Sequence, residues 1–174
     1  EFWVQDYASN LPVASLAVSG KKVLDLCAAP GGKTMQLAYN KANVTAVDIS
    51  KHRLEKLQEN LQRCNLSAKI IHADARDFSE TGFDIVIVDA PCSATGTIRK
   101  NPEILVQKTK RDVLELAKLQ NDILCNASKL GKILIYATCS LEYEESEGQI
   151  RNFLKQFPYF KLEKESRTLP IELA

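Results

Sequence analysis

Reactive or acidic side chains follow each of the short apolar runs in this sequence. These positions are residues 27–34, Asp48, Asp74, residues 89–92 and residues 138–140. In an open parallel sheet, ligands bind beyond the carboxyl ends of the strands, so we expect these positions to meet at one rim. A single aspartate after a strand often only caps a turn or a helix. Five such positions together predict a functional site at this rim.

Two of the cysteines lie at this rim. The chain has five, Cys27, Cys64, Cys92, Cys125 and Cys139. Their number is odd, no two are spaced as CxxC and no histidine lies close to them, which argues against zinc and against a disulfide framework. We expect reduced thiols and no bound metal. Cys64 and Cys125 lie in helical stretches and are expected to be structural, whereas Cys92 and Cys139 follow strands.

A pair of thiols suits methylation of C5 of cytosine. C5 is too weak a nucleophile to take a methyl group from a sulfonium unaided, whereas a thiolate added at C6 turns C5 into an enamine carbon that can. The C5 proton must then leave and the thiol be eliminated, so a second acid-base group is useful. The fourth and fifth strands are neighbours in the usual doubly wound order, which predicts that Cys92 and Cys139 lie close together. A helix capped by Ser140 would favour a thiolate at Cys139, but the acidic residues that follow oppose it, so the balance stays open.

A glycine-rich turn follows the first expected strand. It is no P-loop, because Cys27 stands where the first glycine of that motif belongs, and GxGxxG is absent as well. Gly31 and Gly32 let the backbone come close to a ligand, and Asp48 can accept both hydrogen bonds of a ribose diol. Asp74 can take the exocyclic amine of an adenine. An adenosine ligand without a pyrophosphate fits best, which predicts S-adenosylmethionine as the cofactor.

The segments that must position these residues alternate between short apolar runs and amphipathic stretches. This pattern predicts an α/β, doubly wound, mainly parallel sheet with helices on both faces. The expected strands are residues 23–26, 44–47, 69–72, 85–88 and 133–136, with a sixth at 160–163. The expected helices are residues 33–39, 51–64, 112–129 and 142–157, and Gly131 is expected to stop the third of them.

Composition limits the number of domains, the location and the kind of partner that this chain can have. With 174 residues, 45% of them hydrophobic, the chain is expected to form a single domain over residues 1–174. No long apolar run or signal peptide is visible, which predicts a cytoplasmic protein with no membrane partner. The 23 Lys and Arg nearly balance 22 Asp and Glu, so an RNA footprint must be local or supplied by further chain. Both chain ends look cut, which suggests a fragment of something longer.

Six motifs along the chain are highly specific in combination. They are Val-Gln-Asp at 4–6 with Ala-Ser at 8–9, Leu-Asp-Leu-Cys-Ala-Ala-Pro-Gly-Gly-Lys-Thr at 24–34, Ala-Val-Asp at 46–48, Asp-Ala-Pro-Cys-Ser-Ala-Thr-Gly at 89–96, Arg99 with Pro102, and Tyr-Ala-Thr-Cys-Ser at 136–140 followed by Glu144 and Glu145. This set resembles the Sun (Fmu, RsmB) group of ribosomal RNA cytosine-5 methyltransferases, relatives of the eukaryotic NOL/NOP/Sun enzymes. The resemblance covers nearly the whole chain.

The resemblance implies a Rossmann-like fold of the class I S-adenosylmethionine-dependent methyltransferase type, acting on C5 of a cytosine in small-subunit ribosomal RNA. We also expect the protein to be a monomer. The resemblance further implies that Cys139 is the nucleophile, that Cys92 assists product release, and that Asp89 and Lys33 lie against the cytosine. Chemistry alone does not choose between the thiols, because DNA cytosine-5 enzymes use the Pro-Cys cysteine. The implied cofactor pocket contains Cys27, Ala28, Ala29, Pro30, Gly31, Gly32, Lys33, Asp48, Arg53, Asp74 and Asp89.

Two family features are expected to lie outside this sequence, an N-terminal RNA-binding region and a last strand ending in a Gly-Phe-Phe-like segment. Arg99, Lys100 and residues 108–111 are candidates for local phosphate contacts. Methylation of a base amino group is a competing activity, but it needs an aromatic residue that residues 89–92 lack. A non-catalytic module that keeps the cofactor fold for RNA binding or subunit contact is the other alternative, and the intact cysteine pair argues against it.

Overall fold

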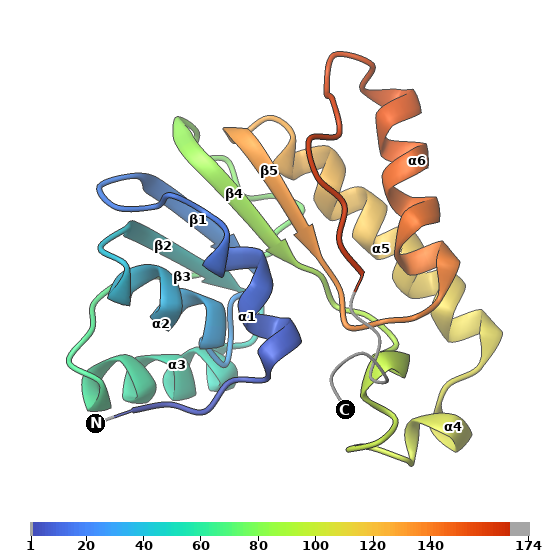
Figure 1. Cartoon of the computed structure of the whole chain (residues 1–174), viewed down its shortest axis with the longest axis horizontal. Helices are drawn as coiled ribbons and strands as arrows, with labels where there is room; N and C mark the ends of the chain where they lie inside the picture. The colour runs from blue at the N-terminus through green and yellow to red at the C-terminus, as the bar shows by residue number, and fades with distance from the viewer. Residues whose placement is uncertain (1, 168–174) are drawn as a thin grey trace. The chain divides into compact units, whose positions relative to one another are not determined.

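The computed structural model describes residues 2–167, which contain a five-stranded sheet (Figure 1). The strands are β1 (Lys22–Leu26), β2 (Asn43–Asp48), β3 (Lys69–His72), β4 (Phe83–Asp89) and β5 (Gly131–Ala137). All pairings are parallel and the spatial order is β3-β2-β1-β4-β5. The chain winds outward from β1 to β3 and then resumes on the other side of β1 with β4. This order confirms the first five predicted strands and the Rossmann-like, class I methyltransferase type of α/β fold.

The described residues divide into two compact units. The first, which we call the sheet unit, runs to Ala90 and includes Cys125–Ala137. The second, the thiol unit, comprises Pro91–Leu124 and the chain from Thr138 onward. The single domain expected over residues 1–174 stays a prediction.

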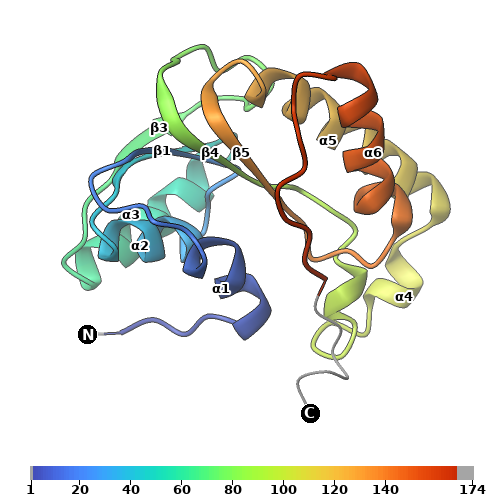
Figure 2. The same cartoon turned by 45° about the horizontal axis from the view of Figure 1, so that its top comes forward.

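Three helices in the sheet unit cover one face of the sheet (Figures 1 and 2). They are α1 (Tyr7–Ala14), α2 (Gly32–Tyr39) and α3 (Lys51–Arg63). In α3, Leu54, Leu57 and Leu61 recur at helical spacing and pack in one buried cluster with Ala46 of β2. Leu37 of α2 lies in a neighbouring cluster with residues of β1, β2 and β4. The apolar stripe of each helix therefore fixes which face it covers.

Helix α1 was absent from the sequence-based prediction, because it is short and contains Pro12. Asp6 caps it by accepting a hydrogen bond from the backbone N–H of Ala8 at 3.1 Å. The side chain of Gln5 donates to the carbonyl of Ser9 at 3.2 Å and to the side-chain oxygen of Gln36 at 3.3 Å. The Gln-Asp motif thus starts α1 and ties it to α2.

The thiol unit is mostly helical. Its elements are η1 (Thr95–Thr97), α4 (Ile104–Gln107), α5 (Lys110–Ala127, whose last residues belong to the sheet unit), η2 (Tyr143–Glu145) and α6 (Glu147–Gln156). Helices α5 and α6 lie side by side (Figures 1 and 2), and the side chain of Gln149 donates a hydrogen bond to the carbonyl of Ala117.

Three predicted boundaries are wrong. The helix expected over residues 142–157 begins only at Glu147, because the backbone of Ser146, with φ −125° and ψ −107°, is not helical. Residues 160–163 form no strand: the chain turns so that the Phe160 ring lies 5.2 Å from that of Phe153. Gly131 opens β5 and does not stop α5. A Cβ at this position would lie 2.8 Å from the carbonyl oxygen of Phe83, so close strand pairing explains the glycine.

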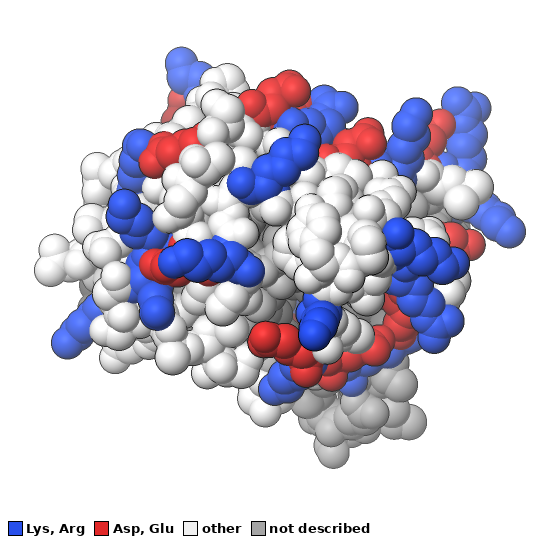
Figure 3. Space-filling view, turned by 90° about the horizontal axis from the view of Figure 1, so that it is seen from above, with Lys and Arg blue, Asp and Glu red and all other residues white. Residues whose placement is uncertain are grey.

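Positive and negative side chains are interspersed over the face seen in Figure 3, which agrees with the near-zero net charge. In residues 2–167, no helix has both the length and the apolar character needed to cross a membrane. The same residues contain no cluster of three or more His, Cys, Asp or Glu suited to a metal ion. Cytoplasmic location and the monomeric state stay predictions.

Candidate active site

The turn after β1 has a backbone conformation that requires glycine at position 31. Gly31 has a φ of 109°, which side chains rarely adopt, and a Cβ there would lie 2.2 Å from Cδ1 of Leu57. Cys27 also has a positive φ, of 60°, and the neighbouring N–H of Ala28 donates to the carbonyl of Val47 at 3.0 Å. The turn is therefore held against β2 before it enters α2.

Asp48, at the end of β2, organises this turn. Its side chain is almost fully buried, and its two oxygens accept hydrogen bonds from the backbone N–H groups of Ala29 at 3.1 Å and Ser50 at 2.9 Å. The guanidinium of Arg53 lies 3.6 Å from Asp48 and donates to the carbonyl of Ala29. A carboxylate offers about four acceptor positions, so these contacts leave acceptor capacity for a ligand. The structure thus brings together three of the predicted cofactor residues.

Asp74 is engaged elsewhere. Its carboxylate pairs with Arg76, with Nη2 to Oδ2 at 2.6 Å and Nε to Oδ1 at 3.0 Å, and these hydrogen bonds lower its pKa. Arg76 therefore competes for the oxygens that were assigned to an adenine amine. That role for Asp74 stays a prediction.

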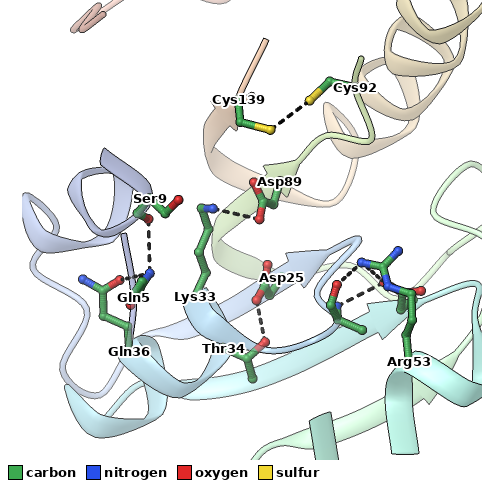
Figure 4. Close-up of polar contacts among 12 residues, drawn as sticks. Gln5, Ser9, Asp25, Lys33, Thr34, Gln36, Arg53, Asp89, Cys92 and Cys139 are labelled. Atoms are coloured by element: carbon green, nitrogen blue, oxygen red, sulfur yellow. Dashed lines mark hydrogen bonds and ion pairs between the residues drawn. The ribbon is translucent and has the colours of Figure 1, made fainter. Parts of the chain in front are cut away.

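Lys33, in the first turn of α2, forms an ion pair with Asp89, the last residue of β4 (Figure 4). The distance from Nζ to Oδ2 is 2.7 Å. The lysine side chain is 9% exposed, whereas that of Asp89 is 40% exposed. The ammonium is therefore buried behind the carboxylate, and the carboxylate is left open to a ligand.

A buried acid that the sequence-based reasoning passed over lies beneath this pair. Asp25, in the middle of β1, is fully buried, and its Oδ2 accepts a hydrogen bond from Thr34 Oγ1 at 2.6 Å. Within the described residues its Oδ1 has no hydrogen-bond partner. Burial raises its pKa from 3.8 to about 7, opposed by the hydrogen bond from Thr34 and supported by the charge of Asp89. A charged residue inside an otherwise apolar strand was the signal that could have found it.

Cys27 is a protonated thiol at neutral pH. Burial raises its pKa from 9.0 to about 12, and the neighbouring carboxylates, Asp48 first, add to the effect. It contributes to the turn through its backbone and is a poor nucleophile at neutral pH.

In the thiol unit, the structure brings Cys92 and Cys139 together, with 3.3 Å between their sulfur atoms (Figure 4). The predicted pairing of the strands that precede them, β4 and β5, is confirmed. Cys139 is exposed and Cys92 is half-buried. The two sulfurs are therefore close enough to share a proton, and Cys139 is the more accessible of the two.

The charge of this pair is expected on Cys92. Its pKa is lowered from 9.0 to about 6, chiefly by the hydrogen bond from the Cys139 thiol, with the Thr138 hydroxyl and the Ala94 N–H helping and burial opposing. The sequence left open which way the balance at Cys139 falls. Since no α-helix begins directly after Cys139, the helix-terminus effect is absent there. Hydrogen bonds, not a helix dipole, set the acidity of the pair.

Known proteins are similar to this chain over most of its length. A family model described as "16S rRNA methyltransferase RsmB/F" matches residues 15–172. The Ribosomal RNA small subunit methyltransferase B of Yersinia pseudotuberculosis is 45% identical over 153 residues, which cover 83% of this chain and 36% of the relative. The chain spans about 36 to 40% of the length of the curated relatives it matches first.

Solved structures are also similar. NSun6 from Pyrococcus horikoshii with SFG has a TM-score of 0.83 and 32% identity, over 95% of this chain and 44% of that chain. The tRNA (uracil-54, C5)-methyltransferase of Pyrococcus abyssi, in complex with S-adenosyl-L-homocysteine, has a TM-score of 0.54 and 26% identity, over 85% of this chain and 31% of that chain.

Proposed function

Because this chain belongs to the 16S rRNA methyltransferase RsmB/F family, we propose that it transfers a methyl group from S-adenosylmethionine to C5 of a cytosine in small-subunit ribosomal RNA. Membership confirms the resemblance drawn from the motifs. The name of the Yersinia relative supports the ribosomal RNA substrate. The Pyrococcus abyssi structure, with its C5 reaction on a pyrimidine and its bound S-adenosyl-L-homocysteine, supports the reaction type and the cofactor.

The observation that carries this proposal is the contact between two thiols of unequal exposure, one of which, Cys92, has a lowered pKa. The Cys139 thiol loses its proton, to the neighbouring Cys92 thiolate in the unchanged protein and to water when Cys92 is replaced, and the Cys139 thiolate adds to C6, which makes C5 nucleophilic. When bound, S-adenosylmethionine supplies the methyl group on its sulfonium. Cys92, having lost its proton to water, then accepts the proton of C5, and elimination breaks the C6–S bond. The net change at the base is one methyl group gained and one proton lost.

Orientation of the base is the proposed task of Lys33 and Asp89. The half-exposed Asp89 carboxylate accepts a hydrogen bond from the amino group of the cytosine. It also accepts one from N3–H, whose proton N3 takes from water as the thiolate adds to C6 and returns to water on elimination. The Lys33 ammonium, 2.7 Å from Asp89, fixes that carboxylate in position.

The residues around the glycine-rich turn fit the cofactor by the chemistry of their donor and acceptor groups. Asp48 offers acceptor oxygens to a ribose diol, and the turn offers backbone groups without side-chain bulk at Gly31 and Gly32. The full set proposed to hold S-adenosylmethionine is Cys27, Ala28, Ala29, Pro30, Gly31, Gly32, Lys33, Asp48, Arg53, Asp74 and Asp89.

Trapping of the covalent intermediate tests the division of labour between the thiols. With 16S ribosomal RNA and S-adenosylmethionine, Cys139→Ala is expected to form no covalent protein–RNA adduct, whereas Cys92→Ala accumulates one because release fails. Denaturing gel electrophoresis separates the adduct from the free RNA. Cys64→Ala, at the end of α3, is the control and behaves as the unchanged protein. Adduct with Cys139→Ala and none with Cys92→Ala would reverse the assignment.

The competing functions give different outcomes. Methylation of an amino group would yield N4-methylcytosine and no adduct with either variant. A non-catalytic RNA-binding module would yield no methylated nucleoside at all. Mass spectrometry of nucleosides from the treated RNA distinguishes these products from 5-methylcytosine.

A further inference from the structure

A fully buried carboxylate lies between the two loops that carry the thiols. Glu145, in η2 of the thiol unit, has no exposed surface. Its Oε1 accepts hydrogen bonds from the backbone N–H of Ser93 at 2.9 Å and from Nε2 of Gln120 at 3.0 Å. Its Oε2 accepts from the hydroxyls of Ser140, at 2.5 Å, and of Ser93. Donors that surround both oxygens in this way offset the cost of burying a carboxyl group.

The partners of Glu145 are the residues next to the thiols. Ser93 follows Cys92 directly and Ser140 follows Cys139 directly. The two serine hydroxyls are also 3.1 Å apart, and both residues are buried. One carboxylate therefore binds both cysteine loops at the residue adjoining each sulfur.

A second contact shows that these two loops pack closely against each other. The N–H of Gly96 donates to the carbonyl of Cys139 at 2.9 Å, and a Cβ at Gly96 would lie 2.6 Å from that oxygen. Gln120 extends the network to α5, because its Nε2 also donates to the carbonyl of Pro91 at 2.9 Å. The loop of Cys92 is thus fixed on both sides of the thiol.

We propose that Glu145 is a positioning residue that holds Cys92 and Cys139 in contact, through Ser93 and Ser140. It does not touch the reacting atoms, and its effect passes through the serine neighbours of the thiols. The catalytic consequence rests on the proposed function. The positioning itself does not, because the distance between the sulfurs can be probed without RNA or cofactor.

The probe is the equilibrium of the thiol pair with glutathione. Oxidised glutathione takes two electrons, the two thiols lose two protons to form the Cys92–Cys139 disulfide, and two molecules of reduced glutathione are released. The equilibrium constant measures the effective concentration of one thiol at the other. Peptide mapping by mass spectrometry assigns the disulfide to this pair.

Glu145→Ala is expected to lower that constant about tenfold, because buried donors lose their acceptor and the loops separate. Glu145→Gln is expected to restore most of it. Its amide oxygen can face the Ser93 N–H and Gln120, while its amide nitrogen donates to the serine hydroxyls, which can accept. Glu144→Gln, at the neighbouring position, is the control and leaves the constant unchanged.

A merely structural role predicts a different pattern. If Glu145 only stabilised the fold, Glu145→Ala would be less stable, but its folded form would have an unchanged glutathione equilibrium constant. That result would overturn the proposal. If Glu145→Ala does not fold by circular dichroism, Ser140→Ala takes its place, with Ser128→Ala as a buried-serine control. An unchanged constant in folded Ser140→Ala overturns the proposal equally.

The assay of methylation separates this proposal from the proposed function. If the unchanged protein makes no 5-methylcytosine while Glu145→Ala still lowers the glutathione constant, the function fails and the positioning stands. If methylation occurs, Glu145→Ala is expected to lower kcat with little change in the KM for S-adenosylmethionine. A normal kcat for Glu145→Ala together with a lowered glutathione equilibrium constant would show that the positioning does not affect catalysis.

Discussion

Cys27 and Cys92 each follow a strand of the same sheet, yet their thiols are shifted in opposite directions. Cys27 comes directly after β1, and burial beside Asp48 raises its pKa to about 12. Cys92 comes three residues after the end of β4, and a hydrogen bond from Cys139 lowers its pKa to about 6. Both thiols are partly shielded from solvent. Burial alone therefore does not decide whether a cysteine is reactive.

The difference lies in what surrounds each sulfur. Around Cys27 the nearby charged groups are mostly carboxylates, which disfavour a second negative charge. Around Cys92 the contacts are hydrogen-bond donors from the Cys139 thiol, the Thr138 hydroxyl and backbone N–H groups. The sheet unit uses carboxylates to fix a backbone turn, whereas the thiol unit uses donors to stabilise an anion.

Alkylation with iodoacetamide offers the largest test of this contrast. At about pH 7 the thiolate fraction differs by roughly five orders of magnitude between pKa values of about 6 and about 12. The lower intrinsic nucleophilicity of the more acidic thiolate offsets part of this, which leaves about a hundredfold faster labelling of the Cys92–Cys139 pair than of Cys27. Mass spectrometry of peptides against time measures both rates. Equal rates would remove the contrast.

Replacement of Asp48 tests the carboxylate side of the comparison. Asp48→Ala removes the acceptor for the N–H groups of Ala29 and Ser50, so the turn loosens and an acceptor for the ribose is lost. We expect the Kd for S-adenosylmethionine, measured by calorimetry, to rise about tenfold to thirtyfold. Asp84→Ala, at the opposite end of the sheet, is the control with unchanged affinity. A normal Kd for Asp48→Ala would contradict the proposed pocket.

The sequence predicted the sheet well because strand periodicity and chain order are local signals. The rim residues Asp48, Asp89 and Cys92 could be placed from the end of each strand alone. The late start of α6 depends on the backbone at Ser146, and the turn at Phe160 depends on ring contacts. Hydrophobic periodicity in the sequence indicates neither of them.

The burial of Glu145 was hidden for a related reason. Next to Glu144 it has the pattern of a solvated acidic run, and only the tertiary structure brings Ser93, Ser140 and Gln120 to its oxygens. The serine that follows each thiol, in two matching Cys-Ser pairs, was the one trace of this network in the sequence. The Arg76 partner of Asp74 was also not predicted, although it lies two residues away, because an aspartate after a strand indicates a ligand group or a cap and not an ion pair.

Asp25 offers a test of the stability of the carboxylate-rich region. Its pKa is raised from 3.8 to about 7 in the folded protein, so between about pH 4 and 7 the folded state holds a proton that the unfolded state has released. The free energy of unfolding should therefore fall as the pH rises through this window, by at most about 1.4 kcal/mol per pH unit.

Asp25→Asn removes this titration, so its stability should be nearly flat over the same window even if its absolute stability is lower. Chemical denaturation at a series of pH values measures both slopes. Asp84→Asn is the control: the pKa of Asp84 is lowered by the backbone N–H of Lys22, so its contribution is lost only below the window and the slope above it is retained. A slope in Asp25→Asn equal to that of the unchanged protein would show that another group carries the titration.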